Sequence, residues 1–153
     1  MPIVLYDASK LHPDDLNGIL VSEKILCGIV NNYPIGRTAV PFESIDMYAN
    51  NDRTFRVFVK NPDLNIVDLT DAIGVLTIKE KKNDTSNVLI KSTNIKGEGE
   101  LGSRDEGEMF FYLVPTDTED LSIQQYVYDI NVTLKSGKRY TVIEGVLNLQ
   151  QAT

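Results

Sequence analysis

Apolar and polar residues alternate with a period of two over most of the chain after residue 52. This period places every second side chain on the same face of a β-strand. Turn-forming runs, such as Asn61-Pro62-Asp63 and Ser136-Gly137-Lys138, separate the alternating segments. The pattern predicts seven strands, at residues 53–60, 66–69, 73–80, 87–91, 109–114, 124–135 and 138–149.

The last two segments predict a long antiparallel hairpin closed at Ser136-Gly137-Lys138. Within this hairpin, Glu144-Gly145 interrupts the alternation of the second strand. Glycine tolerates the backbone angles of a β-bulge, so we expect a bulge there. One face of the first strand is expected to be buried; it comprises Tyr126, Tyr128, Ile130, Val132 and Leu134.

A short connection lies between residues 114 and 124. Thr116 and Glu119 have the spacing of a capping box, which predicts a single helical turn that begins at Thr116 and crosses between two sheets. Tyr126 follows, where a sandwich can place a tyrosine whose hydroxyl fastens the crossing; an ordinary strand tyrosine is the alternative. Seven short strands without a long helical pattern predict a mainly β, antiparallel two-sheet sandwich over residues 53–149, with a short tail at 150–153.

Residues 1–52 have a different pattern and predict an N-terminal extension. Pro13 suits a helix start, but Gly18 and Gly28 weaken a helix, and residues 19–21 suit a strand equally well. An apolar segment without its own core packs either on the sandwich or on a neighbouring subunit. We expect the second, an attachment arm whose contact residues are Leu16, Ile19, Leu20, Ile25, Leu26, Ile29, Tyr33 and Phe42.

Composition excludes several classes of function. The 153 residues have a net charge of -7, whereas a nucleic-acid binder needs a concentrated basic surface. The single cysteine, Cys27, allows no intrachain disulfide or multi-cysteine metal site, and we interpret it as a small buried apolar residue. There is no secretory signal and no apolar run of roughly 20 residues, the length that spans a membrane. We therefore expect a protein of the reducing cytoplasm, or of a particle assembled there.

The candidate chemistry of the chain is sparse. His12, beside Pro13, is the only histidine, which argues against a catalytic proton shuttle. The acidic, glycine-rich segment 96–108 would repel phosphate, and we expect a mobile solvated loop there. A calcium site is the alternative; it would use Glu98, Glu100, Asp105, Glu106 and Glu108. We predict no catalytic residue, no metal site and no cofactor.

Four short motifs together resemble one family. They are Asp68-Leu69-Thr70 with Ala72, Pro115-x-Asp117-Thr118, Tyr126-x-Tyr128-Asp129-Ile130-x-Val132, and Gly137-Lys138-x-Tyr140-Thr141-Val142-x-Glu144-Gly145. This set is similar to the immunoglobulin-like domains of tailed-bacteriophage virion proteins. Those include the N-terminal domains of upper baseplate proteins and related tail, neck or capsid-attached domains. The resemblance covers roughly residues 53–149. Asp71 stands where the family commonly has glycine, and the first 52 residues have no recognised counterpart.

The resemblance implies a seven-stranded immunoglobulin-like sandwich in a non-enzymatic structural protein. Such a protein would be assembled into virions in the bacterial cytoplasm, in a symmetric multi-copy assembly. Its partners would be other virion structural proteins. The family does not supply the mode of anchoring, so attachment through the N-terminal segment is expected from the apolar residues of that segment alone. The composition predicts no nucleic-acid and no membrane partner. The alternative is a receptor- or glycan-binding module that uses the loop at residues 97–107.

Overall fold

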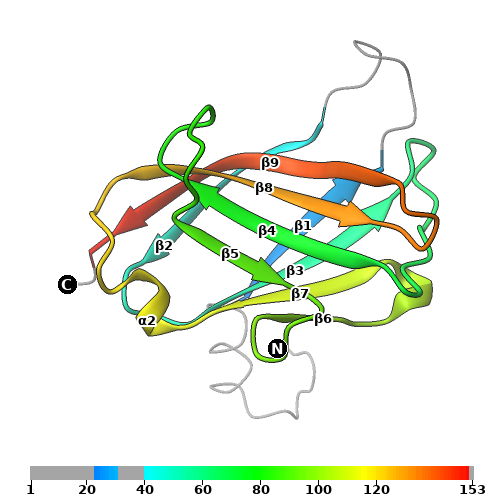
Figure 1. The fold of residues 1–153 in the computed structure, drawn as a ribbon, viewed down its shortest axis with the longest axis horizontal. Helices are drawn as coiled ribbons and strands as arrows, with labels where there is room; N and C mark the ends of the chain where they lie inside the picture. The colour runs from blue at the N-terminus through cyan, green and yellow to red at the C-terminus, as the bar shows by residue number, and fades with distance from the viewer. Residues whose placement is uncertain (1–22, 31–39, 152–153) are drawn as a thin grey trace, which may run out of the picture.

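Two β-sheets pack face to face in the computed structural model, which describes residues 23–30 and 40–151 (Figure 1). Sheet A has the strand order β1 (Glu23–Ile29), β3 (Arg53–Lys60), β7 (Glu108–Leu113) and β6 (Gly99–Leu101). Sheet B has the order β2 (Phe42–Tyr48), β9 (Arg139–Gln150), β8 (Gln125–Thr133), β4 (Ile73–Lys79) and β5 (Leu89–Ser92). A 3-10 turn, η1 (Arg104–Glu106), precedes β7, and the helix α2 (Pro115–Thr118) links β7 to β8.

The core lies between the two sheets and is built by the period-two alternation. In β3, the inward side chains Phe55, Val57 and Val59 are fully buried, while the residues between them are half-exposed. The expected buried face of β8 is confirmed for Tyr126, Tyr128, Ile130 and Val132, with Leu134 packed against the core just after the strand. Burial of these apolar faces is the main driving force for the two sheets to associate.

The expected sandwich is confirmed, but two details of it are wrong. Six of the seven expected strands form, whereas residues 66–69 contribute only a single bridge, between Lys60 and Ile66. The described residues form nine strands, because β1, β2 and β6 were not expected. The pairing is also mixed, since β1 runs parallel to β3 and β2 runs parallel to β9.

Two of the three additional strands, β1 and β2, come from the region that the sequence assigned to an extension. β1 adds to sheet A and β2 adds to sheet B, and their inward residues Leu26 and Ile45 are each 1% exposed. Of the two packings considered for this region, these strands adopt the one against the sandwich. Residues 23–29 form a strand rather than part of the helix that Pro13 could start, and the strand considered at residues 19–21 lies outside the described residues. Residues 1–22 and 31–39 lie outside the described residues.

Glycine at position 145 has a different role from the expected bulge. The register of β8 and β9 shifts between Ile130 and Asn131, which places the irregularity opposite Val142. Gly145 instead allows β2 to approach β9 closely, since a Cβ atom there would lie 1.8 Å from the carbonyl oxygen of Glu43. The cross-strand neighbour of Gly145 is Tyr128, whose hydroxyl donates a 2.9 Å hydrogen bond to that same oxygen.

The crossing from sheet A to sheet B is fastened at both ends of the connection. The helical turn begins after Val114 rather than at Thr116, because the Asp117 carboxylate accepts a 2.8 Å hydrogen bond from the Val114 N–H. Asp117 also forms a buried 2.8 Å ion pair with Lys91 of β5. The Tyr126 hydroxyl donates a 2.7 Å hydrogen bond to the carbonyl of Ser122, which confirms the fastening role considered for this tyrosine.

We predict that Gly145→Ala destabilises the protein by about 2 kcal/mol or more, because the new Cβ atom forces the β2 backbone away from β9. Urea denaturation measures the loss, and amide hydrogen exchange should accelerate in β2. The control is Gly137→Ala, where φ is +89° and no atom lies within 4 Å. That change costs only about 1 kcal/mol of backbone strain. Equal losses in the two variants would contradict the close-approach role.

Candidate interaction surface on sheet A

The outer face of sheet A presents an ordered group of aromatic side chains around one arginine. Arg56 and Phe58 belong to β3, and Phe110 and Tyr112 belong to β7. They point outward because their sequence neighbours, such as Val57 and Phe111, fill the core. All four side chains are half-exposed. We call this set the aromatic face.

The guanidinium of Arg56 organises the rings. Its central carbon lies 4.9 Å from the ring centre of Phe58 and 5.9 Å from that of Phe110, within the range of cation–π attraction. Phe110 and Tyr112 are stacked, with ring centres 6.2 Å apart and planes at 5°. The aromatic face is therefore held in one arrangement by its own contacts.

Glu108, the first residue of β7, holds the guanidinium of Arg56 in place. Arg56 donates to one carboxylate oxygen through Nε at 2.7 Å and through a terminal nitrogen at 2.6 Å. The Ser103 N–H donates to the other oxygen at 3.0 Å. The hydrogen bond from Ser103, together with the Arg56 guanidinium, lowers the pKa of Glu108 against the opposing effect of burial. The carboxylate thus stays charged and fixes the direction of Arg56.

Tyr112 extends the face to the edge strand β6. Its hydroxyl donates a short hydrogen bond to the carboxylate of Glu100. Burial, with the neighbouring negative charge of Glu100, raises the pKa of Tyr112 to about 12, so the phenol remains a proton donor at physiological pH. Strand register aligns four residues across sheet A, in the order Ile25, Arg56, Phe110 and Glu100.

This arrangement suits protein docking rather than chemistry. Aromatic residues and arginine are enriched at the centres of protein interfaces, where they account for much of the binding energy. Side chains that are already ordered lose less conformational entropy when a partner binds. The aromatic face therefore has the residue types and the rigidity of a contact surface.

The structure separates the contact residues that the sequence predicted. Ile25 is 52% exposed and lies beside Arg56 on the outer side of sheet A. Phe42 is 64% exposed and begins β2 in sheet B. Leu26 is buried in the core and is not available to a partner, while Ile29 is half-buried. The remaining predicted residues lie outside the described ones; they are Leu16, Ile19, Leu20 and Tyr33.

Cys27 is exposed, so its interpretation as a buried apolar residue is wrong. Its neighbours Leu26 and Gly28 face the core, and alternation therefore turns Cys27 outward, in register with Phe58. Gly28 lies close to β9, where a Cβ atom would meet a Val142 methyl group at 2.9 Å. The thiol thus lies on the same outer side of sheet A as the aromatic face.

The acidic segment 96–108 contains the short strand β6, the 3-10 turn η1 and the first residue of β7. Three of its carboxylates accept hydrogen bonds from within the chain: Glu98 from the Ser92 N–H at 3.1 Å, Glu100 from Tyr112, and Glu108 from Arg56. In the part of the chain that the structure describes, no group of three or more potential ligands is arranged to hold a metal ion. The structure therefore gives the calcium alternative no support.

Sequence reasoning missed the aromatic face because it used the alternation of residues only to predict strands and their buried faces. The signal was present in the alternation. In residues 53–60, Phe55, Val57 and Val59 already define the buried face, which leaves Arg56 and Phe58 on the other one. An outward arginine between outward rings could have indicated a surface cluster.

No protein-family model and no curated protein matches the chain. The chain is similar in structure to the N-terminal domain of phage TP901-1 ORF48, with a TM-score of 0.47 and 4% sequence identity; the match covers 84% of this chain and 100% of that chain. A likeness at this level carries no argument about function. Among residues 23–30 and 40–151, no helix is long and apolar enough to cross a membrane.

We predict that Glu108→Gln costs about 2 kcal/mol at pH 7, because a hydrogen-bonded charge opposite Arg56 is lost. The folded pKa of Glu108 is below its unfolded value of about 4.3, so its contribution is complete above that pH and is lost as the pH falls through the folded pKa. The difference between the two proteins should therefore shrink below about pH 4.

Urea denaturation at pH 7, 4 and 3 measures this trend. Glu106→Gln is the control, since Glu106 is an exposed carboxylate two positions away in the same segment. The control should change stability by less than about 0.5 kcal/mol. A cost of Glu108→Gln that is constant over this pH range would contradict the assigned role of the charge.

Proposed function

We propose that this protein is a non-enzymatic structural subunit of a tailed-phage particle, attached to other virion proteins through the outer side of sheet A and the N-terminal segment. The proposed setting rests on the four motifs that resemble immunoglobulin-like virion domains. The proposed mode of attachment rests on one observation, the ordered and half-exposed aromatic face.

The motif residues have structural roles in this fold. Their roles support a resemblance to the family in architecture. The Asp68 carboxylate accepts hydrogen bonds from the N–H and the hydroxyl of Thr70, at 2.9 and 2.7 Å, and Leu69 is fully buried. Asp71 has φ +60°, in the left-handed region that glycine adopts freely. That conformation gives a physical reason why glycine is common at this position of the family.

The aromatic face supports attachment because it offers a partner both apolar area and an oriented cation. A stable interface hides about 800 Å² on each partner, and the half-exposed side chains of the aromatic face would form part of that area. Ile25 extends the apolar surface onto the edge strand β1. Residues 1–22 join the sandwich at Glu23, the first residue of that strand. In this proposal they continue the contact through Leu16, Ile19 and Leu20.

The alternative function, a receptor- or glycan-binding module that uses residues 97–107, has weaker support. Glu98, Glu100 and Glu108, in and beside this segment, already accept hydrogen bonds from Ser92, Tyr112 and Arg56. A ligand that needed these carboxylates would have to displace contacts that stabilise the fold. We therefore prefer attachment as the function of this side of the molecule.

We predict that Ile25→Asp reduces incorporation of the protein into phage particles about tenfold, because it places a charge in the proposed interface. The measurement is quantitative mass spectrometry of purified particles from cells that supply only the variant. Ile90→Asp is the matched control, since Ile90 is 47% exposed on a strand of sheet B. The control should incorporate normally.

Three results would count against the proposal. Normal incorporation of Ile25→Asp would reject sheet A as the attachment surface. A protein without residues 1–22 that incorporates normally would reject the N-terminal contribution. Absence of the unaltered protein from purified particles would reject the structural role itself.

A further inference from the structure

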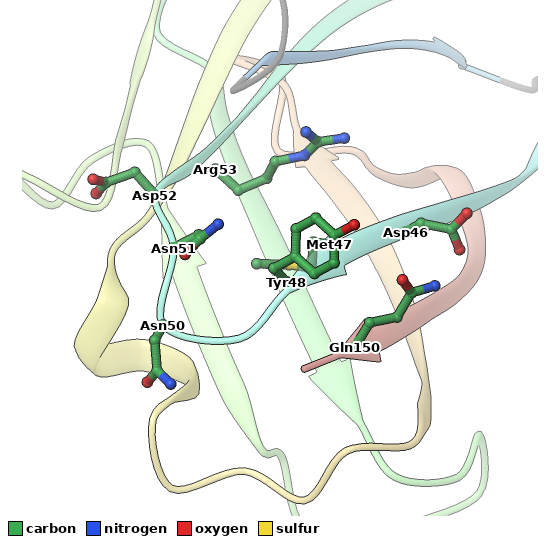
Figure 2. Close-up of a pocket in the computed structure, with 8 residues that line it drawn as sticks. All are labelled: Asp46, Met47, Tyr48, Asn50, Asn51, Asp52, Arg53 and Gln150. Carbon is green, nitrogen blue, oxygen red and sulfur yellow. The ribbon is translucent and has the colours of Figure 1, made fainter. Parts of the chain in front are cut away.

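A second feature lies away from the aromatic face, at the corner where the chain passes from sheet B to sheet A. Here a pocket of about 530 Å³ opens between the end of β2, the start of β3 and the end of β9 (Figure 2). Its volume lies within the range of about 300–1,000 Å³ that is typical of small-molecule sites. Among the described residues, the pocket and the aromatic face share no side chain.

The corner that forms the pocket is held in place by backbone hydrogen bonds. The Asn50 N–H donates to the Thr118 hydroxyl oxygen at 2.8 Å, which joins the corner to α2. The Ala49 N–H donates to the carbonyl of Gln150 at 2.8 Å, which joins it to β9. Asn50 itself has φ +66°, a left-handed conformation that asparagine adopts more readily than most residues. The pocket is therefore largely pre-formed.

An exposed aromatic ring lies in the middle of this pocket. Tyr48, at the end of β2, is 51% exposed, and Figure 2 shows its ring among the surrounding polar side chains. Tyr126 and Tyr128 were expected in the core and are buried there. Tyr48 instead offers an apolar ring face to any ligand that enters the pocket.

The polar groups around the ring supply both donors and acceptors. Arg53 provides a guanidinium, Asn51 and Gln150 provide amides, and Asp46 and Asp52 provide carboxylates. Asp46 is oriented by the Asn148 amide, which donates a 2.9 Å hydrogen bond to it. Burial lowers the pKa of Arg53, and the charge of Asp46 opposes that shift. An arginine remains protonated in proteins, so the pocket keeps one cation beside two carboxylates.

We propose that this pocket binds a neutral saccharide. A pyranose ring has an apolar C–H face that can stack on a tyrosine, and its hydroxyl groups both donate and accept hydrogen bonds. Amides, carboxylates and a guanidinium around one exposed ring match that combination. Two carboxylates against one guanidinium disfavour an anionic ligand, because the negative charges would repel it. The polar side chains that line the pocket disfavour a purely apolar ligand, because it would remove them from water and offer no hydrogen bonds in return.

The test uses the full-length protein, labelled with ¹⁵N, and titration with separate sugars observed by NMR. The probes are glucose, galactose, rhamnose and N-acetylglucosamine, with glucuronate as the anionic comparison. At least one neutral sugar should shift backbone amide signals at Tyr48, Asn51 and Arg53. Glucuronate should bind at least about tenfold more weakly than that sugar.

Matched variants identify the site. Tyr48→Ala should weaken binding about tenfold, because the stacking surface is lost. Phe42→Ala should leave binding unchanged, since Phe42 is an exposed ring on the same strand but outside the pocket. The amide spectrum of each variant reports whether it is folded.

Three results would overturn the proposal: no shift at the pocket with any of the four neutral sugars, tighter binding of glucuronate, or unchanged binding by a folded Tyr48→Ala variant. None of these results bears on attachment through sheet A. The two proposals can therefore fail separately.

Discussion

The close contact between β2 and β9 at Gly145 is the constraint on which the rest of the architecture depends. Because position 145 has no side chain, the Glu43 backbone lies against β9, and Tyr128 reaches across to donate its hydroxyl to the Glu43 carbonyl. This contact fixes β2 at the edge of sheet B. The position of β2 then determines where the chain turns and where β3 enters sheet A (Figure 1). The corner pocket opens at this turn.

The same alternation that builds the core also builds the proposed contact surface. Each inward residue of β3 and β7 places its neighbour on the outer side of sheet A, and several of these neighbours are aromatic. An arginine on such a surface would ordinarily be mobile. Here Glu108 is hydrogen-bonded from Ser103 and holds Arg56 in turn. These side chains thus lose their conformational entropy during folding. A partner that binds later does not have to order them, which favours binding.

Much of the fold could be predicted from sequence, since period-two alternation defines strands and their faces. The bounds expected for β3 match the structure, and so does the fastening role of Tyr126. Alternation does not identify the partner of a strand or its direction, and the parallel pairings of β1 with β3 and of β2 with β9 were therefore missed. β6 has only three residues, too few to show a period. From the sequence alone, Gly145 could permit either a β-bulge or the close approach of another strand. Only the tertiary structure shows that it permits the close approach of β2.

In the proposed mode of attachment, the outer side of sheet A is covered in the particle, and the native thiol provides a direct test. Cys27 is the only cysteine of the chain, is exposed, and lies in register with Phe58. The measurement is the rate at which a maleimide modifies Cys27 in the free protein and in purified particles. A protein with Cys27→Ser and Ile90→Cys serves as the control on sheet B. If the outer side of sheet A is covered, particles protect Cys27 but leave the control cysteine reactive. Equal reactivity of Cys27 in particles and in the free protein would contradict it.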